Sequence, residues 1–317
     1  MQAVFLDTTS LDREDLDRGP LEASATDWSF FDETPADAVP ERIREAEVVI
    51  SNKVPLDAEA IRGAPNLRLI CIAATGTNNV DLEAARQRGV AVTNVVGYAT
   101  PAVVQHVFGL VLALTTRLQD YTAAVAAGRW SQSPHFCLLD FPIAELAGRT
   151  LGVVGHGELG GNVARVAEAF GMQVRVAQLP GRPERPGRIP LNELLPDVDV
   201  LTLHCPLTPE TENLIGRAEL ERLPDDALLI NTARGGIVDE PALAEALREG
   251  RLGGAGVDVL TREPPPADHV LLAPDIPNLI VTPHVAWATR AARQRMVEEL
   301  AANIGAFQRG EERNRVV

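Results

Sequence analysis

The sequence is poor in cysteine and has no pattern of metal-binding histidines. Its 317 residues include three cysteines, Cys71, Cys137 and Cys205, and six histidines, no two of which have metal-ligand spacing. Three scattered cysteines cannot build a disulfide framework, which argues against a small disulfide-rich secreted protein. We therefore expect buried, reduced thiols, a cytoplasmic protein and no metal site.

Basic charge and long hydrophobic segments are also lacking. The chain has 29 Lys and Arg against 44 Asp and Glu, a formal net charge of -15 that repels nucleic acid and anionic lipid. The longest apolar stretch, near residues 107–114, is far shorter than a bilayer span, and no basic region precedes the short apolar run at the N-terminus. We predict a globular protein with no nucleic-acid or membrane partner.

Short apolar runs alternate with helical patterns along most of the chain. The second half has six such runs, at residues 151–155, 173–177, 198–204, 227–231, 254–259 and 278–282. The first hundred residues have four, at 3–7, 46–51, 67–73 and 90–94. This alternation predicts an α/β fold with two doubly wound parallel-sheet domains, a smaller flavodoxin-like domain and a Rossmann domain.

Two helical patterns set the expected domain boundaries. An apolar helix is predicted from Thr100, with Pro101 in its first turn, and an amphipathic helix is predicted to end near Gly310. We expect the second helix to return to the first domain. The predicted domains are residues 1–99 with 289–317, the smaller domain, and residues 100–288, the Rossmann domain. Residues 128–150 are expected to form a functional loop or an intersubunit arm.

The segment "GHGELG" from Gly155 to Gly160 has the glycine spacing of a dinucleotide cradle. Gly155 permits a tight turn, Gly157 lets a pyrophosphate approach the backbone, and Gly160 allows close packing of the following helix. The helix that begins near Glu158 and Leu159 would direct its amides at the phosphates. Because the motif follows one apolar run and precedes another, it predicts cofactor binding rather than a plain turn.

The next strand should end in an acid that holds the adenosine ribose, yet the chain has Gln178 there. A neutral amide can still hydrogen-bond the ribose, and it does not repel a 2′-phosphate. Arg182 and Arg185 are either ligands for such a phosphate or solvated loop residues. We expect NADPH to be tolerated, and the choice between NAD and NADP stays open.

Arg234, Glu263 and His284 each follow a predicted strand of the second domain. Because ligands bind outside the carboxyl ends of parallel strands, we expect the three to face the cofactor. A guanidinium binds a carboxylate through two hydrogen bonds, an imidazolium delivers a proton, and a carboxylate orients the imidazole. Together they suit reduction of a 2-keto acid.

With these motifs the chain resembles the D-isomer-specific 2-hydroxyacid dehydrogenases over nearly its whole length, closest to the glycerate dehydrogenase or hydroxypyruvate reductase branch. The resemblance is carried by "TGTNNVDL", "VVQH", "GHGELGGNVA", "LHCPLTPET", "NTARGGIVDEPAL", "GAGVDV", "EPPP" and "TPHVAWAT". It implies an NAD(P)-dependent oxidoreductase, a homodimer, that reduces hydroxypyruvate or glyoxylate to the D-2-hydroxy acid, with hydride from nicotinamide C4 and a proton from His284.

The resemblance also implies roles for individual residues. Arg234 would bind the substrate carboxylate, His284 would be the acid and base, and Glu263 would tune His284. Asp258 would face the nicotinamide carboxamide. The remaining cofactor contacts implied are Val104, His204, Cys205, Pro206, Thr232 and Ala233. The implied substrate contacts in the small domain are the backbone amides of Thr75, Gly76 and Thr77.

Several alternatives remain open. Trp287 is either a packing aromatic or a wall of the substrate pocket, and His106 is either a buried histidine or a residue that shapes the site. A 3-phosphoglycerate dehydrogenase is a rival function, with Lys53 as a candidate for the phosphate, although we expect no regulatory domain after Val317. Formate and phosphite dehydrogenases also resemble the fold. A non-enzymatic dinucleotide sensor, like the family's corepressors, is a further rival, which the acidic surface disfavours.

Overall fold

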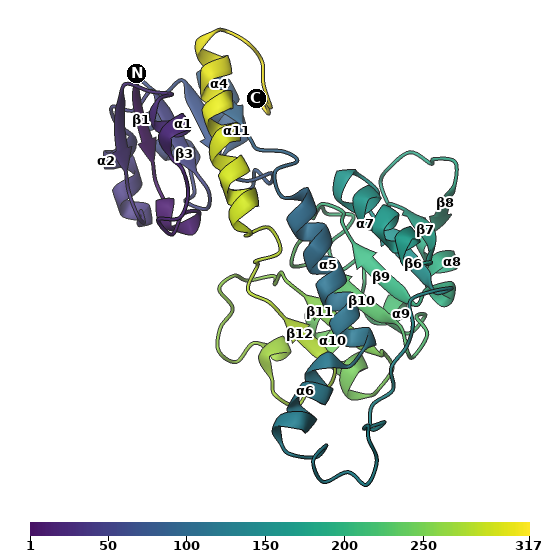
Figure 1. Ribbon diagram of the computed structural model, residues 1–317. Coiled ribbons are helices and arrows are strands. Elements are labelled where there is room, and N and C mark those ends of the chain that lie inside the picture. The colour runs from purple at the N-terminus through teal and green to yellow at the C-terminus, as the bar shows by residue number, and fades with distance from the viewer. The chain divides into compact units, whose positions relative to one another are not determined.

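The computed structural model describes residues 1–317, which divide into two compact units. Unit 1 consists of Met1–Ala99 and Trp287–Val317, and unit 2 of Thr100–Ala286. The second boundary lies two residues before the predicted start of the returning segment at 289. Each unit is built around its own parallel sheet (Figure 1).

Unit 1 has a five-stranded sheet in the order β2-β1-β3-β4-β5, and all its strand pairs are parallel. This is the flavodoxin-like order. The strands are β1 (Gln2–Phe5), β2 (Asp27–Phe30), β3 (Val48–Ser51), β4 (Leu69–Ile72) and β5 (Ala91–Thr93). The sequence predicted all of them except β2, an edge strand whose residues "DWSF" are only partly buried.

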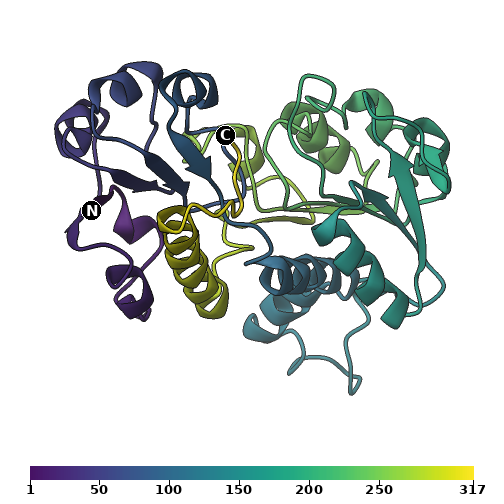
Figure 2. The same cartoon turned by 90° about the horizontal axis from the view of Figure 1, so that it is seen from above.

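Helices cover both faces of this sheet (Figure 2). The helices are α1 (Gly19–Glu22), α2 (Val39–Ile43), α3 (Ala58–Gly63), α4 (Leu82–Arg88) and α11 (Arg290–Gln308), with short 3-10 turns at Thr8–Ser10 and Ala36–Ala38. Helices α2, α3 and α4 pack in a row, whereas α11 packs against α1 and β4. The C-terminal helix therefore packs within the first unit.

Unit 2 has a seven-stranded parallel sheet in the order β12-β11-β10-β9-β6-β7-β8. The strands are β6 (Thr150–Val154), β7 (Gln173–Gln178), β8 (Arg188–Pro190), β9 (Val200–Leu203), β10 (Leu228–Asn231), β11 (Gly254–Val257) and β12 (Leu279–Val281). Numbered from β6, this is the Rossmann order with one added strand, and the order reverses between β6 and β9. Only β8, a three-residue edge strand, was not predicted.

The helices of unit 2 lie on both faces of its sheet, so its central strands are wholly buried. They are α5 (Thr100–Thr115), α6 (Leu118–Ala126), α7 (Glu158–Ala169), α8 (Leu191–Leu194), α9 (Arg217–Leu220) and α10 (Glu240–Arg248), with 3-10 turns at Leu195–Asp197 and Val270–Leu272. Arg117, with φ of 52°, separates α5 from α6.

No one helix has the length and apolar composition for a membrane span, and α5 with α6, bent by 59°, meets that test only as a pair. The predicted α/β fold with two doubly wound parallel sheets is confirmed in both units.

Candidate active site

The glycine turn after β6 has different packing at each of its three glycines. Gly155 has φ of +94°, and a Cβ there would lie 2.6 Å from the backbone of His204 and Cys205. A Cβ on Gly160 would lie 2.0 Å from the carbonyl oxygen of Gly155, whereas one on Gly157 would meet nothing within 4 Å. The first and third glycines thus serve the fold, and the second borders open space.

This turn fits a dinucleotide phosphate. No side chain caps the first turn of α7, which begins at Glu158, so its amides can face an anion. The Glu158 carboxylate is directed elsewhere, since its Oε1 accepts a hydrogen bond of 2.6 Å from Thr100 Oγ1. The open space at Gly157 therefore adjoins unused donors, as a bound pyrophosphate would require.

Two unpartnered polar atoms lie at the ends of the neighbouring strands. His204 Nδ1, after β9, and Thr232 Oγ1, after β10, are buried without a hydrogen-bond partner. The other ring nitrogen of His204, Nε2, lies 2.9 Å from Thr202 Oγ1. Burial lowers the pKa of His204 to about 4, so the ring is neutral near pH 7. Buried orphan groups of this kind are rare and fit a ligand that supplies their partners.

Four more of the predicted cofactor residues lie at the same strand ends or on helix α5. Val104 on α5, Cys205 and Ala233 are buried, and Pro206 is exposed. Burial raises the pKa of the Cys205 thiol to about 11, so it is uncharged and unreactive near neutral pH.

Gln178, the last residue of β7, organises the loop that follows it. Its Nε2 donates to the carbonyl oxygens of Leu179, Arg182 and Pro183, at 3.2, 3.0 and 3.2 Å, and its Oε1 accepts from the Arg185 amide at 3.3 Å. The side-chain amide is thus engaged by the backbone of its own loop.

Glu210 lies close to this loop. A Cβ on Gly181 would be 3.1 Å from Glu210 Cγ. A hydrogen bond from the Thr208 side chain, with a smaller contribution from the charge of Arg182, lowers the pKa of Glu210. One of the two arginines considered for a 2′-phosphate therefore has a carboxylate nearby.

Glu263 and His284 are in direct contact. Glu263 Oε2 lies 2.6 Å from His284 Nδ1, and the other carboxylate oxygen accepts from the Leu260 amide at 2.9 Å. Both side chains are partly exposed. The carboxylate fixes the orientation of the imidazole, and Nε2 is the ring nitrogen that faces away from it.

Asp258 holds the turn on which His284 lies. It is 1% exposed, and its carboxylate accepts from the amides of Val285 and Ala286, each at 2.9 Å. Its backbone oxygen accepts from the His284 amide at 2.8 Å. His284 has φ of 54°, a left-handed conformation that costs energy outside glycine, and these bonds stabilise it.

The Asp258 carboxylate also takes part in a chain of side chains that begins on α5. Thr282 Oγ1 donates to Asp258 Oδ1 at 2.5 Å, and His106 Nε2 lies 3.0 Å from the same hydroxyl. His106 is therefore part of the hydrogen-bonded support behind the His284 turn.

Arg234 lies on a turn shaped by Asn231, a buried residue at the end of β10. Asn231 Nδ2 donates to the Arg234 carbonyl at 2.9 Å, and its Oδ1 accepts from the Ala233 amide at 3.1 Å. A Cβ on Gly235 would lie 2.0 Å from the backbone of Leu260, so this turn packs tightly on the loop of Glu263. Asn231 was not predicted, although a polar residue ending an apolar strand was a visible signal.

The predicted substrate residues Thr75, Gly76, Thr77 and Trp287 belong to unit 1. Thr75 Oγ1 donates to the Val95 carbonyl at 2.7 Å, which anchors the loop after β4. The Trp287 ring lies edge-on to Tyr98, with ring centres 6.3 Å apart.

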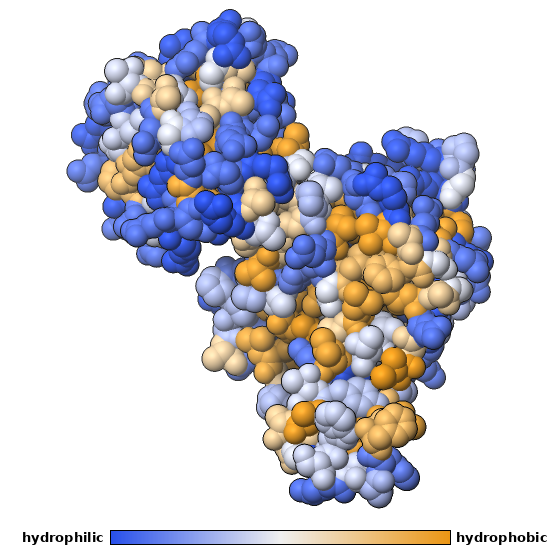
Figure 3. All heavy atoms as spheres, viewed as in Figure 1, coloured by the Kyte–Doolittle hydropathy of each residue, from blue (hydrophilic) through white to orange (hydrophobic).

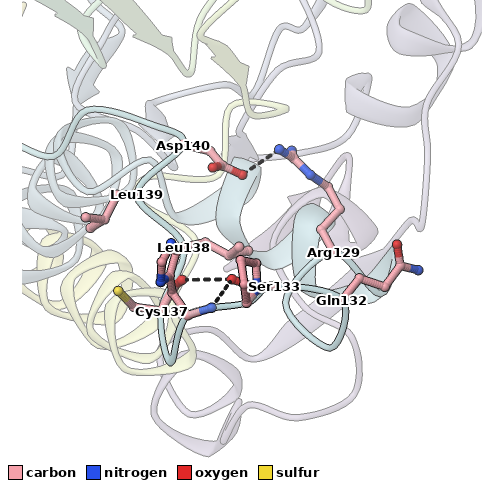
Figure 4. A pocket seen from close by; sticks show the side chains of 9 residues that line it. Arg129, Gln132, Ser133, Cys137, Leu138, Leu139 and Asp140 are labelled. Atoms are coloured by element: carbon pink, nitrogen blue, oxygen red, sulfur yellow. Dashed lines mark hydrogen bonds and ion pairs between the residues drawn. The ribbon is translucent and has the colours of Figure 1, made fainter.

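A cavity of about 470 Å³ lies in the segment after α6 (Figure 4). Arg129 and Asp140, which both line it, form an ion pair at 2.5 Å. Ser133 Oγ accepts from the His135 amide at 3.1 Å and donates to the Cys137 carbonyl at 3.4 Å. Its lining residues are Arg129, Gln132, Ser133, Pro134, His135, Cys137, Leu138, Leu139 and Asp140. None of them was predicted as a site residue.

Residues 108–286 match the family model described as "D-isomer specific 2-hydroxyacid dehydrogenase, NAD binding domain". The chain is 44% identical over 307 residues to a glycerate dehydrogenase of Methylorubrum extorquens, covering 94% of this chain and 96% of that protein. It is 34% identical over 317 residues to a hydroxypyruvate reductase of Blautia hydrogenotrophica, covering 98% of each.

A similar solved structure is an NADPH-dependent glyoxylate/hydroxypyruvate reductase from Sinorhizobium meliloti, in complex with NADP and malonate. It has a TM-score of 0.83 and 28% identity, and the match covers 100% of this chain and 96% of that one.

Proposed function

Since the chain belongs to the D-isomer specific 2-hydroxyacid dehydrogenase family, we propose that it reduces hydroxypyruvate, glyoxylate or a similar small 2-keto acid to the D-2-hydroxy acid. The reductant is NADH or NADPH. The observation that carries the proposal is the 2.6 Å contact of Glu263 with His284, in the same unit as the glycine turn and next to the Arg234 turn.

Arg234, His284 and Glu263 have different roles in the proposed reaction. The Arg234 guanidinium binds the substrate carboxylate and polarises the adjacent carbonyl. His284 delivers a proton from Nε2 to the carbonyl oxygen, and Glu263 at Nδ1 holds the ring in position and stabilises its charged form. A bound nicotinamide supplies the hydride. In the reverse direction His284 accepts the proton of the 2-hydroxyl group.

The dinucleotide is assigned to unit 2. The amides at the start of α7, together with Gly155, Gly157 and Gly160, hold the pyrophosphate, because the turn leaves space at the second glycine. His204 Nδ1 and Thr232 Oγ1 supply polar contacts that the protein itself leaves unused. The other assigned contacts are Val104, Glu158, Leu159, Gln178, Arg182, Cys205, Pro206, Ala233 and Asp258.

Substrate recognition is assigned in part to unit 1. The backbone amides of Thr75, Gly76 and Thr77 contribute to binding the carboxylate, and Trp287 limits the size of the substrate side chain. A bulky indole favours hydrogen or hydroxymethyl at that position.

We further propose a cytoplasmic homodimer joined through residues 128–150. In this segment Phe136 is 91% and Leu139 is 85% exposed, which is unusual for large apolar side chains. Figure 3 shows apolar atoms gathered over the face of unit 2 that carries α5 and α6, continuing toward this segment. Equilibrium sedimentation should give twice the 34.0 kDa chain mass, and a monomer at micromolar concentration would refute the dimer.

A substrate panel tests the proposed activity. Hydroxypyruvate, glyoxylate, pyruvate and 3-phosphohydroxypyruvate are offered with NADH and with NADPH, and oxidation of the cofactor is followed spectrophotometrically. Hydroxypyruvate and glyoxylate should give the highest kcat/KM. A preference for the phosphorylated substrate, or no turnover of any of the four, would contradict the proposal.

A further inference from the structure

The loop that carries Glu263 is tied to helix α10 by a largely buried carboxylate. Glu240, the first residue of α10, has a side chain that is 11% exposed. Its Oε1 accepts from the Thr261 amide at 2.7 Å and from the Thr261 hydroxyl at 3.0 Å. A largely buried carboxylate is costly unless it is fully hydrogen-bonded, and these bonds account for one of its oxygens.

The other oxygen is held by a largely buried histidine. His269 Nε2 lies 3.0 Å from Glu240 Oε2, and the histidine side chain is 10% exposed. The Leu271 amide donates to His269 Nδ1 at 3.2 Å, so the neutral ring carries its proton on Nε2 and donates it to the carboxylate. Every polar atom of this pair therefore has a partner, and the ring tautomer is fixed.

The tied segment is very short. Thr261 lies two residues before Glu263. The amide of Leu260, the residue that precedes Thr261, donates to Glu263 Oε1 at 2.9 Å. One end of the loop is thus fixed by Glu240, and the other presents its carboxylate to His284. A shift of Thr261 would be passed to Glu263 with few intervening bonds to absorb it.

We propose that Glu240, with His269, is a positioning residue that keeps Glu263 within hydrogen-bonding distance of His284. Its effect on turnover rests on the proposed function, whereas its effect on the Glu263–His284 contact does not. Glu240 belongs to the same segment as the Arg234 turn, so one short stretch of chain supplies the proposed carboxylate anchor and fixes the loop of the acid-base pair.

The test variant is Glu240→Gln, which is isosteric. In one orientation its amide nitrogen would face the Nε2–H of His269, which places two donors against each other. In the flipped orientation the nitrogen would face Thr261, which would then have no acceptor for its amide. The matched control is Glu245→Gln on the same helix, where an exposed carboxylate pairs with Arg217. A second variant, Thr261→Val, removes only the hydroxyl bond at an exposed position and keeps the fold.

Two readouts are used on the full-length chain. Steady-state kinetics with hydroxypyruvate give kcat and KM, and fluorescence titration gives Kd for NADPH. Nitrogen-15 NMR of labelled histidines reports the hydrogen-bonded Nδ1 of His284, which is assigned by its loss in His284→Gln. The NMR readout needs no turnover.

We expect Glu240→Gln to lower kcat about 10- to 100-fold, with Kd for NADPH within twofold, and to weaken the His284 Nδ1 signal of the hydrogen-bonded form. Thr261→Val should shift both readouts in the same direction by a smaller factor, and Glu245→Gln should match the wild type. Unchanged kcat and an unchanged His284 signal in Glu240→Gln, or a loss of thermal stability alone, would overturn the positioning role.

The outcomes separate this inference from the proposed function. If the wild type turns over none of the 2-keto acids, the proposed function fails and the NMR comparison alone decides the role of Glu240. If Glu240→Gln does not fold, Thr261→Val decides it: an His284 signal like that of the wild type would then overturn the inference.

Discussion

Gly235→Ala is expected to separate Glu263 from His284 although the new methyl group contacts neither residue. The new Cβ would lie 2.0 Å from the carbonyl carbon and oxygen of Leu260 and 2.3 Å from the Thr261 nitrogen. Non-bonded carbon atoms approach to about 3.5 Å, so the two segments must separate by about 1.5 Å. All three atoms are backbone, so no side-chain rotation relieves the overlap.

The displaced segment carries Glu263. Its carboxylate lies 2.6 Å from His284 Nδ1, and a retreat of about 1 Å would take that pair beyond the roughly 3.2 Å limit of a good hydrogen bond. A misplacement of about 1 Å costs about 100-fold in rate, which corresponds to about 2.7 kcal/mol of activation free energy. We expect kcat to fall by about that factor.

The assay is turnover of hydroxypyruvate with NADPH, with Kd for NADPH as the measure of an intact cofactor site. Gly253→Ala is the matched control, because its Cβ would also meet backbone, at 2.5 Å from Asp226 O. Gly253 directly precedes β11, whereas the clash at Gly235 is with the segment that follows β11. The control should lose stability and keep kcat. Wild-type kcat in Gly235→Ala, or an equal loss of kcat in Gly253→Ala, would show that packing of the Gly235 turn does not position Glu263.

Three further predictions concern the cofactor and the substrate. His204→Gln should reduce the fall in the free energy of unfolding between pH 7 and pH 4.5, which chemical denaturation at the two pH values measures. Burial lowers the pKa of His204 from 6.5 to about 4, so the folded state keeps the ring neutral while the unfolded chain takes up a proton. The stability of the wild type is therefore unaffected by His204 above about pH 6.5 and falls by up to about 3 kcal/mol as the pH drops toward 4. Gln178→Glu should raise the ratio of kcat/KM for NADH over NADPH at least tenfold, because a carboxylate repels a 2′-phosphate and accepts from ribose hydroxyls; an unchanged ratio would show that this position does not select the cofactor. Trp287→Ala should raise kcat/KM for bulkier 2-keto acids relative to glyoxylate, and identical selectivity would remove Trp287 from the pocket wall.

The central strands were predictable because burial on both faces demands continuous apolar runs. β9 and β10 are wholly buried, and their sequences show it. β2 and β8 were missed because each is an edge strand: the first is partly exposed and the second is three residues long and ends in Pro190. The break between α5 and α6 was also missed, since Arg117 adopts a left-handed conformation with no glycine to signal it.

Residues of the candidate site could be predicted only where a side chain with suitable chemistry follows directly after a predicted strand. Glu263 and His284 follow two neighbouring strands, and the structure joins them. The residues that support the site act through contacts with loops, and the spacing of residues in the sequence does not show how those loops fold. The hydrogen bonds of Gln178 to its own loop and of Glu240 to Thr261 belong to this class.

Asp258 shows the same limit in another form. The family resemblance implies that it faces the nicotinamide, and in the structure its carboxylate accepts hydrogen bonds from the backbone amides of the His284 turn. A residue at a strand end can thus support the turn that carries a site residue, and this role depends on tertiary hydrogen bonds that the sequence does not show.

In the proposed reaction His284 exchanges the proton during reduction of a small 2-keto acid. The most direct measurement compares wild type and His284→Gln for oxidation of NADPH by hydroxypyruvate, with Kd for NADPH measured on the same samples. We predict a loss of kcat of at least about 100-fold with Kd within about twofold, since general acid catalysis contributes about 100- to 10,000-fold. Turnover of His284→Gln at the wild-type rate would contradict it.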